Sequence, residues 1–244
     1  MIYSSKQNPK IKEIASLKEK KYRQKLGLYL VEGIKSVAEA IRMQKDVVKI
    51  VVAEDKLGNF VDFKGEIITV TNDVFNYLSD EVTPQGVMAV IKIPSLTPKV
   101  PTGNCLLLDG VSDPGNLGAI IRSANAFGFK DIYLVNSVDA FSSKVVRASM
   151  SGIFSVNIYN GSYDECLQAL KGYQIIVADM DGEDVNSFIP PNKFVLVMGN
   201  EGNGVSAYLK GLASKTLSIP MRKECESLNV AVASAIIMFK FSNI

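Results

Sequence analysis

Residues 106–124 read LLLDGVSDPGNLGAIIRSA. The segment begins with an apolar run that is typical of a buried strand and continues through a loop of aspartate, proline, glycine and asparagine into a helix. The helix carries a single cation, Arg122, among alanine and isoleucine residues. Polar loops that follow buried strands are where open α/β sheets build their sites. The segment therefore predicts an α/β fold with a site at the carboxyl end of a strand.

Short apolar runs and helical patterns alternate from residue 105 onward. Strands are predicted at 105–109, 131–135, 155–159, 174–178, 194–198 and 216–219, and helices at about 117–127, 142–150, 162–171, 205–212 and 227–240. Several of these strands are apolar throughout, as strands covered on both faces are. The pattern predicts a parallel sheet whose strands are connected through helices.

The chain before residue 94 predicts a smaller α/β domain. Its expected elements are a basic helix at roughly 8–20, strands at 29–31, 47–53, 66–70 and 87–93, and helices at 36–43 and 72–79. Pro94, Pro98 and Pro101 then interrupt the pattern among serine and threonine, a composition typical of a linker. We expect domains at 1–93 and 104–244, joined by a linker at 94–103.

The composition narrows the class of protein. The chain has 244 residues, which suits one or two domains at about 150 residues each. No apolar run reaches the roughly 18 residues that span a bilayer, and the N-terminus is polar from Ser4 to Lys12. We therefore expect a cytoplasmic protein with no membrane partner.

Catalysis by imidazole is excluded, because the sequence contains no histidine. Cys105, Cys166 and Cys225 form no CxxC pair, so we expect neither a zinc site nor a disulfide framework. Any chemistry must rely on other side chains or on a reactive cosubstrate.

Basic residues gather at the N-terminus, although the net charge of +2 is too small to indicate nucleic acid by itself. The cluster consists of Lys6, Lys10, Lys12, Lys18, Lys20, Lys21, Arg23 and Lys25. Such a cluster can contact phosphates, or it can be the solvated face of a helix.

Two later loops also follow predicted strands. Residues 198–206 read MGNEGNGVS, where three glycines allow the backbone to approach a ligand closely. The loop is neither a Walker phosphate loop nor GxGxxG. Residues 219–229 read IPMRKECESLN and lead into a strongly apolar helix. All three loops carry polar groups that the fold itself does not need.

Structural explanations stand beside the functional ones. Asn116 is well placed to cap the helix of residues 117–127, and either Ser227 or Asn229 can cap the last helix. The glycine loop can be a tight turn, although Glu201 at its tip is a residue that a plain turn does not need. Arg122 can form a structural ion pair, but a buried unpaired guanidinium is costly, so it should face either a partner or a site.

Taken together, the three loops resemble the SpoU family of the SPOUT methyltransferase superfamily. The similar segments are 113–118 with 122–124, then 197–206, then 219–221 with 226–230. The similarity covers about 104–244, and its three motifs occur in order. A weaker similarity links residues 8–12 and 30–33 to the family's substrate-binding domain.

The resemblance implies a mostly parallel sheet whose C-terminal part is tied in a deep trefoil knot, an exception to the rule that chains do not thread. It implies a small ribosomal-protein-like α/β domain before the knotted domain. It also implies S-adenosylmethionine as cofactor and a homodimer with the active site at the subunit interface. The implied reaction is methyl transfer to a ribose 2′-hydroxyl of RNA, with 23S ribosomal RNA as the expected substrate.

Site residues follow from the resemblance by position. The residues implied for catalysis are Asn116, Arg122, Glu201, Ser227 and Asn229, and those implied for cofactor binding, largely through backbone, are Met198, Gly199, Ile219, Met221 and Leu228. No metal is needed, because the methyl group of a sulfonium is already activated. Arg122 is often assigned as base in the family, but arginine keeps its proton in nearly all proteins, so binding a phosphate and a developing alkoxide is the other role left open.

Three alternatives remain at this stage. The protein can be a tRNA 2′-O-ribose methyltransferase, or a catalytically silent RNA-binding protein with the same fold. The separate N-terminal domain favours ribosomal RNA by family habit. A nucleotide-dependent dehydrogenase is suggested only by the alternation of strands and helices, and the absence of GxGxxG after a first strand argues against it.

Overall fold

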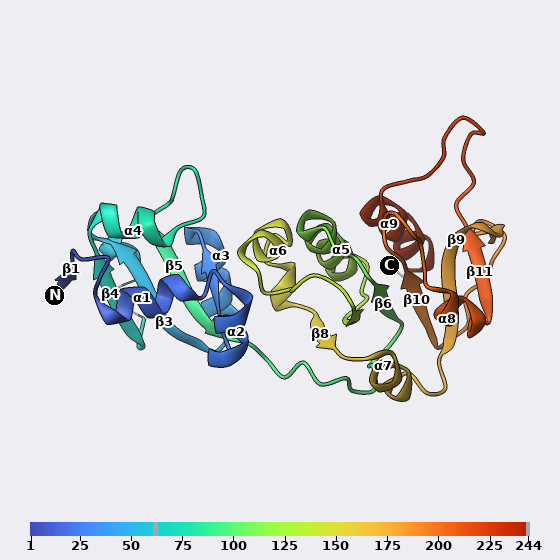
Figure 1. Cartoon of the computed structure of the whole chain (residues 1–244), viewed down its shortest axis with the longest axis horizontal. Coiled ribbons are helices and arrows are strands. Elements are labelled where there is room, and N and C mark those ends of the chain that lie inside the picture. The colour runs from blue at the N-terminus through green and yellow to red at the C-terminus, as the bar shows by residue number, and fades with distance from the viewer. Residues whose placement is uncertain (61–62, 243–244) are drawn as a thin grey trace. The chain divides into compact units, whose positions relative to one another are not determined.

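The computed structural model describes residues 1–60 and 63–242, apart from the side chains of Leu57 and Asn59 (Figure 1). The chain folds into two units. Met1–Pro94 and Phe141–Phe154 form the first unit, and Ser95–Ala140 and Ser155–Ile244 form the second. The first unit therefore includes a segment that lies between two strands of the second unit in the sequence.

A mixed five-stranded sheet in the order β1–β4–β3–β5–β2 forms the first unit. Its strands are β1 (Ile2–Tyr3), β2 (Leu28–Glu32), β3 (Val47–Ala53), β4 (Glu66–Val70) and β5 (Val87–Lys92). β5 pairs antiparallel with β2 and with β3, while β3 and β4 are parallel. The strands expected from the sequence in this region are confirmed, and β1 is an additional short edge strand.

Helices cover this sheet and fill its core with aliphatic and aromatic side chains. They are α1 (Pro9–Ser16), α2 (Lys20–Leu26), α3 (Ile34–Arg42), α4 (Asn72–Leu78) and α6 (Ser143–Ala148), with 3₁₀ turns η1 (Glu54–Phe60) and η2 (Gly152–Phe154). The single basic helix expected at 8–20 is wrong, because α1 ends at Ser16 and a second helix begins at Lys20. Buried Arg23 of α2 donates hydrogen bonds to the carbonyl oxygens of Leu17 and Lys18, which are thereby satisfied outside a helix.

The second unit contains a parallel six-stranded sheet in the order β11–β9–β10–β6–β7–β8. Its strands are β6 (Cys105–Asp109), β7 (Asp131–Val135), β8 (Asn157–Asn160), β9 (Gln174–Asp184), β10 (Phe194–Met198) and β11 (Lys215–Ser218). Every residue of β6, β7 and β10 is buried, as expected of strands that are covered on both faces. The predicted α/β fold with a mostly parallel sheet is confirmed.

The helices of the second unit are α5 (Pro114–Ala126), α7 (Tyr163–Ala169), α8 (Ala207–Gly211) and α9 (Val230–Phe241). The chain leaves β6 through α5 toward β7 on one side, and it leaves β10 through α8 toward β11 at the opposite edge. β6 and β10 are neighbours, so their carboxyl ends form the point where the connections diverge. Ligands of open α/β sheets bind at such a point.

The expected linker at 94–103 contains no helix or strand, yet it is tied to the second unit. Thr102 donates two hydrogen bonds of 2.8 Å, from its backbone nitrogen and its hydroxyl, to the buried Asp131 carboxylate. The Tyr133 hydroxyl donates to the carbonyl oxygen of Lys99. These bonds hold the segment along the amino ends of the strands.

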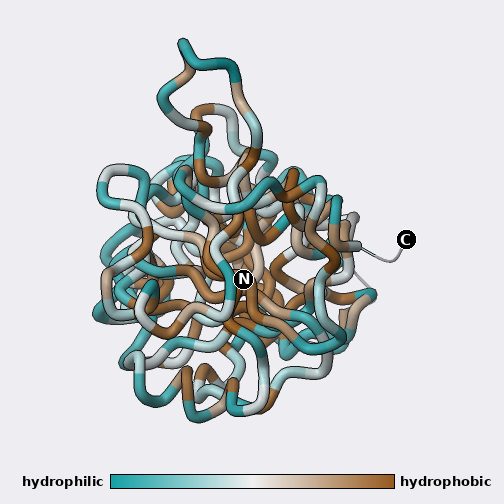
Figure 2. Tube along the Cα trace, turned by 90° about the vertical axis from the view of Figure 1, so that its right-hand side faces the viewer, coloured by the Kyte–Doolittle hydropathy of each residue, from teal (hydrophilic) through white to brown (hydrophobic). Residues whose placement is uncertain are grey.

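Hydrophobic segments run through the interior, and the peripheral loops are more hydrophilic (Figure 2). The loop between β11 and α9 projects from the rest of the second unit (Figure 1) and is hydrophilic toward its tip (Figure 2). Within the described ranges, no helix is long and apolar enough to cross a membrane.

Candidate active site

The first loop differs from expectation in the residue that caps its helix. Asp113, not Asn116, is the N-cap of α5, and its side chain accepts a 2.8 Å hydrogen bond from the backbone nitrogen of Asn116. Pro114 occupies the first helical position, which suits it because proline lacks an N–H. The capping role expected for Asn116 is therefore wrong, and its amide is available for other partners. Gly128 follows the helix with φ of 79°, as expected of a C-terminal glycine.

Asn200 ties the second loop to the end of β6. Its side-chain nitrogen donates a 2.7 Å hydrogen bond to the carbonyl oxygen of Gly110, and its side-chain oxygen accepts one of 2.8 Å from the backbone nitrogen of Gly202. Asn200 and Gly204 also bridge each other through their backbones. A Cβ on Gly199 would overlap the backbone at Gly204, so the tight closure of this loop requires glycine there.

A chain of side-chain hydrogen bonds joins all three loops. The Asn229 side-chain nitrogen donates to the side-chain oxygen of Asn116 at 2.9 Å, and the Asn116 side-chain nitrogen donates to the Glu201 carboxylate at 2.7 Å. Asn229 and Glu201 are exposed, and Asn116 is half-buried. Three of the five residues expected for catalysis thus lie in contact, although 85 positions separate Asn116 from Glu201 and 113 separate it from Asn229.

The helix cap fixes the direction of this chain. Asn229 is the N-cap of α9, where its side-chain oxygen accepts hydrogen bonds from the backbone nitrogens of Ala231 and Val232. Its NH₂ group must therefore point away from the helix, toward the oxygen of Asn116. The NH₂ group of Asn116 is then left for Glu201, which accepts as a carboxylate. The expectation that Ser227 or Asn229 caps α9 is confirmed for Asn229.

The other two expected catalytic residues stand apart from this chain. Arg122 lies on the exposed face of α5, and within residues 1–60 and 63–242 it forms no hydrogen bond or ion pair. The sequence argument from the cost of burial is therefore wrong for Arg122, because the single chain leaves the guanidinium in solvent. Ser227 is exposed in the third loop, where its carbonyl oxygen contacts the Cys225 thiol.

Three of the residues expected to bind the cofactor lie at the ends of β10 and β11, and Met221 and Leu228 lie in the loop after β11. Met198 and Gly199 are buried where β10 ends, and Ile219 directly follows β11. Ile219 and Leu228 are half-buried, while Met221 is exposed. These residues offer apolar side chains and loop backbone, not charged groups. The described residues contain no group of three or more Cys, Asp or Glu side chains placed to hold a metal ion.

Sequence reasoning missed two side chains that shape the site. Asp109 at the end of β6 accepts a hydrogen bond from the backbone nitrogen of Ser206, and Asn200 bonds to Gly110. The sequence signal for Asp109 was a charged residue at the end of an apolar run. Its partner lies 97 positions away, so no local pattern could identify it.

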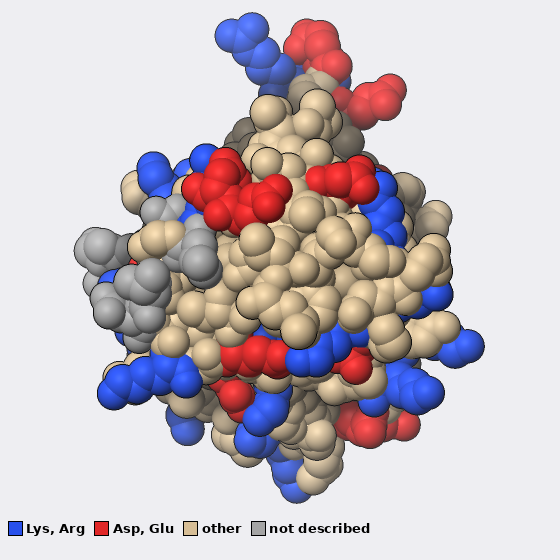
Figure 3. Space-filling view, turned by 90° about the vertical axis from the view of Figure 1, so that its left-hand side faces the viewer, with Lys and Arg blue, Asp and Glu red and all other residues tan. Residues whose placement is uncertain are grey.

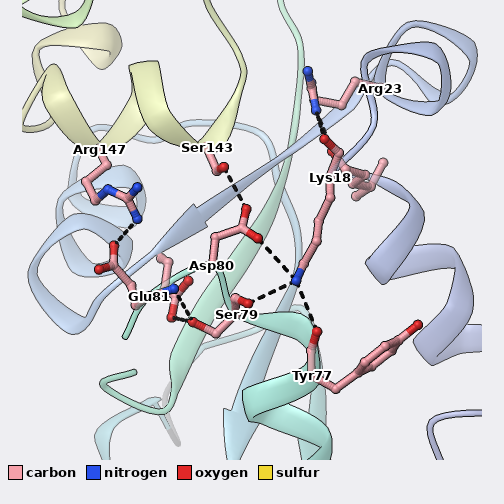
Figure 4. A network of polar contacts seen from close by, with 10 residues as sticks. Lys18, Arg23, Tyr77, Ser79, Asp80, Glu81, Ser143 and Arg147 are labelled. Carbon is pink, nitrogen blue, oxygen red and sulfur yellow. Dashed lines mark hydrogen bonds and ion pairs between the residues drawn. The ribbon is translucent and has the colours of Figure 1, made fainter. Parts of the chain in front are cut away.

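Half of the N-terminal basic cluster is engaged in contacts within the first unit: Lys6, Lys10, Lys18 and Arg23. Lys6 pairs with Asp73 and Lys10 with Glu66, at 2.9 and 2.8 Å. The Lys18 ammonium contacts Asp80 and two backbone carbonyls of the α4 end (Figure 4).

The same network receives side chains from the segment 141–154. Ser143 donates a 2.7 Å hydrogen bond to Asp80, and Arg147 forms a 2.5 Å ion pair with Glu81 (Figure 4). Burial acts to raise the pKa of Asp80, but the bonds from Ser143 and Lys18 outweigh it and hold that pKa below its usual value. These charged side chains therefore stabilise the first unit by pairing with one another.

A parallel sheet with three polar loops at the carboxyl ends of its strands defines an α/β protein of the class that binds ligands at that edge of the sheet. The chain belongs to the SpoU rRNA Methylase family, which matches residues 103–239. An MRM3-like substrate binding domain matches residues 8–89. The resemblance seen in the three motifs is thereby confirmed.

Similar proteins match nearly the whole chain. The 23S rRNA (guanosine(2553)-2′-O)-methyltransferase RlmP of Bacillus subtilis is 32% identical over 241 residues, which cover 96% of each protein. A putative RNA methyltransferase of the TrmH family from Porphyromonas gingivalis has a TM-score of 0.87 at 33% identity, covering 96% of this chain and 97% of that one. The AdoMet-bound rRNA methyltransferase from Sinorhizobium meliloti has a TM-score of 0.88 at 28% identity, covering 98% and 96%.

Proposed function

We propose that the protein transfers a methyl group from S-adenosylmethionine to a ribose 2′-hydroxyl of ribosomal RNA, with 23S ribosomal RNA as the substrate and the cytoplasm as its location. The observation that carries this proposal is the chain from Asn229 through Asn116 to Glu201. It brings together residues of all three family motifs at the divergence point of the sheet. The catalytic residues are these three with Arg122 and Ser227.

The proposed cofactor site uses the ends of β10 and β11. Ile219 and Leu228 are half-buried apolar side chains suited to an adenine ring, and Met198 is buried at the end of β10. Gly199 adds no side chain to the loop, and Met221 extends the apolar group. When bound, S-adenosylmethionine supplies an activated methyl group. The protein would then have to orient the hydroxyl for in-line transfer, stabilise the charge that develops on its oxygen and let its proton pass to a base or to solvent.

The roles of the polar side chains follow from their contacts. Asn116 is held from both sides, so it presents a fixed edge to an incoming ribose. Glu201 accepts from Asn116 and retains further oxygen lone pairs for a hydroxyl donor. Arg122 keeps its charge, so its assigned role is to bind the phosphate beside the ribose and to stabilise the developing alkoxide. Ser227 supplies a hydroxyl from the same loop that carries Asn229.

A homodimer is part of the proposal. Helix α9 is apolar apart from Ser234 and Lys240, and its buried residues lie along one face. Val232, Ile236 and Phe239 lie along the other face and are 48%, 38% and 67% exposed. A helix that is apolar all round needs apolar cover on each face. α9 packs against α5, so a second copy seated there would also lie beside the helix of Arg122.

The proposal also includes a trefoil knot in the C-terminal part of a methyltransferase domain at 104–244. β11 lies at one edge of the sheet, whereas α9, which follows it, packs on α5 near the middle. The chain must therefore return across the sheet after β11. This return through the long 219–229 loop supports threading of the C-terminal segment.

The first unit, at 1–93, is proposed to be a ribosomal-protein-like domain that contacts the RNA. Seen from the side of the N-terminus, its face has a broad uncharged centre, with Lys and Arg at the rim beside Asp and Glu (Figure 3). Lys12, Lys20, Lys21 and Lys25 are exposed and form no ion pair within the described residues. Three of these four lie on or at the start of α2, so we assign the phosphate contact to that helix.

The experiment that tests the proposal maps 2′-O-methylated nucleotides in total RNA from cells with and without the protein. We expect one or a few sites in 23S ribosomal RNA to lose the modification. If the modification is lost only from tRNA, the substrate is tRNA and not 23S ribosomal RNA. An unchanged map of 2′-O-methylation in both RNA classes would overturn the proposal.

A further inference from the structure

Asp109 is a buried carboxylate at the end of β6, outside the chain that joins Asn116, Glu201 and Asn229. It is 5% exposed. One carboxylate oxygen accepts a 2.8 Å hydrogen bond from the backbone nitrogen of Ser206, and the other accepts one of 2.7 Å from the Tyr163 hydroxyl. A buried carboxylate is costly unless its oxygens are bonded, so both donors hold it in place.

The bond to Ser206 fixes the point where the second loop ends. Ser206 is the N-cap of α8, directly after the glycine-rich loop. The point where that loop begins is fixed by Asn200, which donates to Gly110 beside Asp109. Both ends of the loop are therefore held by the carboxyl end of β6, and Glu201 lies between them.

Tyr163 of α7 supports this arrangement and packs against the same hydrophobic cluster as Val205 and Leu209. It is the first residue of α7, which is held by a capping box between Ser162 and Glu165. Its ring packs against Tyr208 of α8 with 5.3 Å between centroids. Burial, together with the bond to Asp109, raises the pKa of Tyr163, so the hydroxyl remains a proton donor across the neutral range.

We propose that Asp109 and Tyr163 are positioning residues for methyl transfer: they clamp the second loop so that Glu201 stays within hydrogen-bonding distance of Asn116. The inference rests on the proposed function, because it assigns these two residues to the transfer site. Met198 is the last residue of β10 and Gly199 directly follows it, so both precede the hydrogen bonds of Asn200 and Ser206 that hold the loop. Loss of the clamp should therefore impair transfer while leaving cofactor binding intact.

The chain contains a matched pair for comparison. Asp131 is also a buried carboxylate, and it accepts a 3.3 Å hydrogen bond from the Tyr159 hydroxyl. Asp131 begins β7, at the amino end of the strands and away from the three loops, and Tyr159 lies on the neighbouring strand β8. Tyr159→Phe thus removes the same kind of bond from the same sheet without touching the second loop.

The test compares full-length Tyr163→Phe and Tyr159→Phe with the wild type. We expect kcat for RNA methylation to fall at least tenfold in Tyr163→Phe, with the dissociation constant for S-adenosylmethionine within twofold of wild type. Tyr159→Phe should keep kcat within twofold. Amide hydrogen exchange of residues 199–206 should be faster only in Tyr163→Phe, and this measurement does not depend on activity.

The outcomes separate this inference from the proposed function. If Tyr163→Phe keeps kcat, if both variants lose kcat alike, or if Tyr163→Phe loses cofactor affinity, the clamp is overturned. If the wild type transfers no methyl group, the proposed function fails, and the exchange measurement alone then decides whether Tyr163 holds the loop.

Discussion

At the scale of single residues, Asn229 controls the direction of the polar chain in the site. Its oxygen is committed to two backbone nitrogens at the start of α9, so its NH₂ group can only donate toward Asn116. Asn116 is then forced to donate to Glu201. A helix cap, a common structural device, thereby also aligns three side chains from distant parts of the sequence.

Asn116→Asp should disable this chain. The substitution replaces the NH₂ donor with an oxygen, so two carboxylates would face each other where a 2.7 Å hydrogen bond now lies. We expect RNA methylation to fall by about a hundredfold, as when one fixed donor is lost from a transfer site. Cofactor affinity, measured by calorimetry, should stay within threefold. Asn125→Asp on the exposed part of α5 is the control, and equal losses in both variants would contradict the role of the chain.

Arg122→Lys should lose most turnover while binding the cofactor normally. Lysine retains the charge but lacks the planar fork that binds phosphate through two N–H groups. We expect kcat to fall by roughly a hundredfold. Arg147→Lys, which changes an arginine paired with Glu81 in the first unit, should remain active. Normal turnover of Arg122→Lys would exclude both roles considered for this residue.

How far single residues can be predicted depends on where their partners lie. The cap at Asn229 is local and could be predicted from the sequence. Asp113 and Asn116 are both good capping residues, and only the fit of Pro114 in the first turn distinguishes them. The roles of Asp109 and Asn200 depend on partners 97 and 90 positions away, so they became visible only in the structure.

At the scale of elements, α2 differs from α1 in what its basic residues do. Lys10 of α1 and Lys6 before it are committed to carboxylates, while Lys21 and Lys25 of α2 are exposed without an ion pair among the described residues. Only basic side chains without an acidic partner can neutralise RNA phosphates at no cost to an existing pair.

The double variant Lys21→Ala and Lys25→Ala should therefore weaken RNA binding. We expect the slope of log affinity against log salt to fall by about 1 to 2, with affinity lost uniformly across RNA sequences. Filter binding at several salt concentrations measures this slope. The matched control, Lys6→Ala with Lys10→Ala, should change the slope little. A larger effect from the control pair would contradict the assignment of the phosphate contact to α2.

Element prediction succeeded where periodicity is strong. The fully buried strands β6, β7 and β10 were predicted with their bounds, and the continuous apolar runs of β6 and β10 are typical of strands covered on both faces. The run at 174–178 was expected to be covered in the same way, but β9 extends to Asp184 and is partly exposed. The break between α1 and α2 was missed. It depends on buried Arg23, whose side chain bonds the carbonyl oxygens exposed by the break, and such a contact leaves no periodic signal.

At the scale of the whole molecule, the apolar outer face of α9 predicts self-association. Ile236→Lys places a charge in the middle of the exposed stripe without touching the buried face of the helix. We expect this variant to sediment as a monomer and to lose methylation activity, because Arg122 would no longer lie at a subunit interface. Ile189→Lys, at another exposed apolar position, should leave the dimer intact. A dimeric Ile236→Lys variant would contradict the proposed interface.

The most direct measurement incubates ribosomal RNA with the purified protein and S-adenosylmethionine labelled in its methyl group, and then hydrolyses the RNA with alkali. Alkaline cleavage needs a free 2′-hydroxyl, the group that distinguishes RNA from DNA. Transfer to the ribose predicts label in alkali-resistant dinucleotides and none on DNA of the same sequence. Label released in mononucleotides, or no label in RNA, would contradict the assignment of the three loops to ribose methylation.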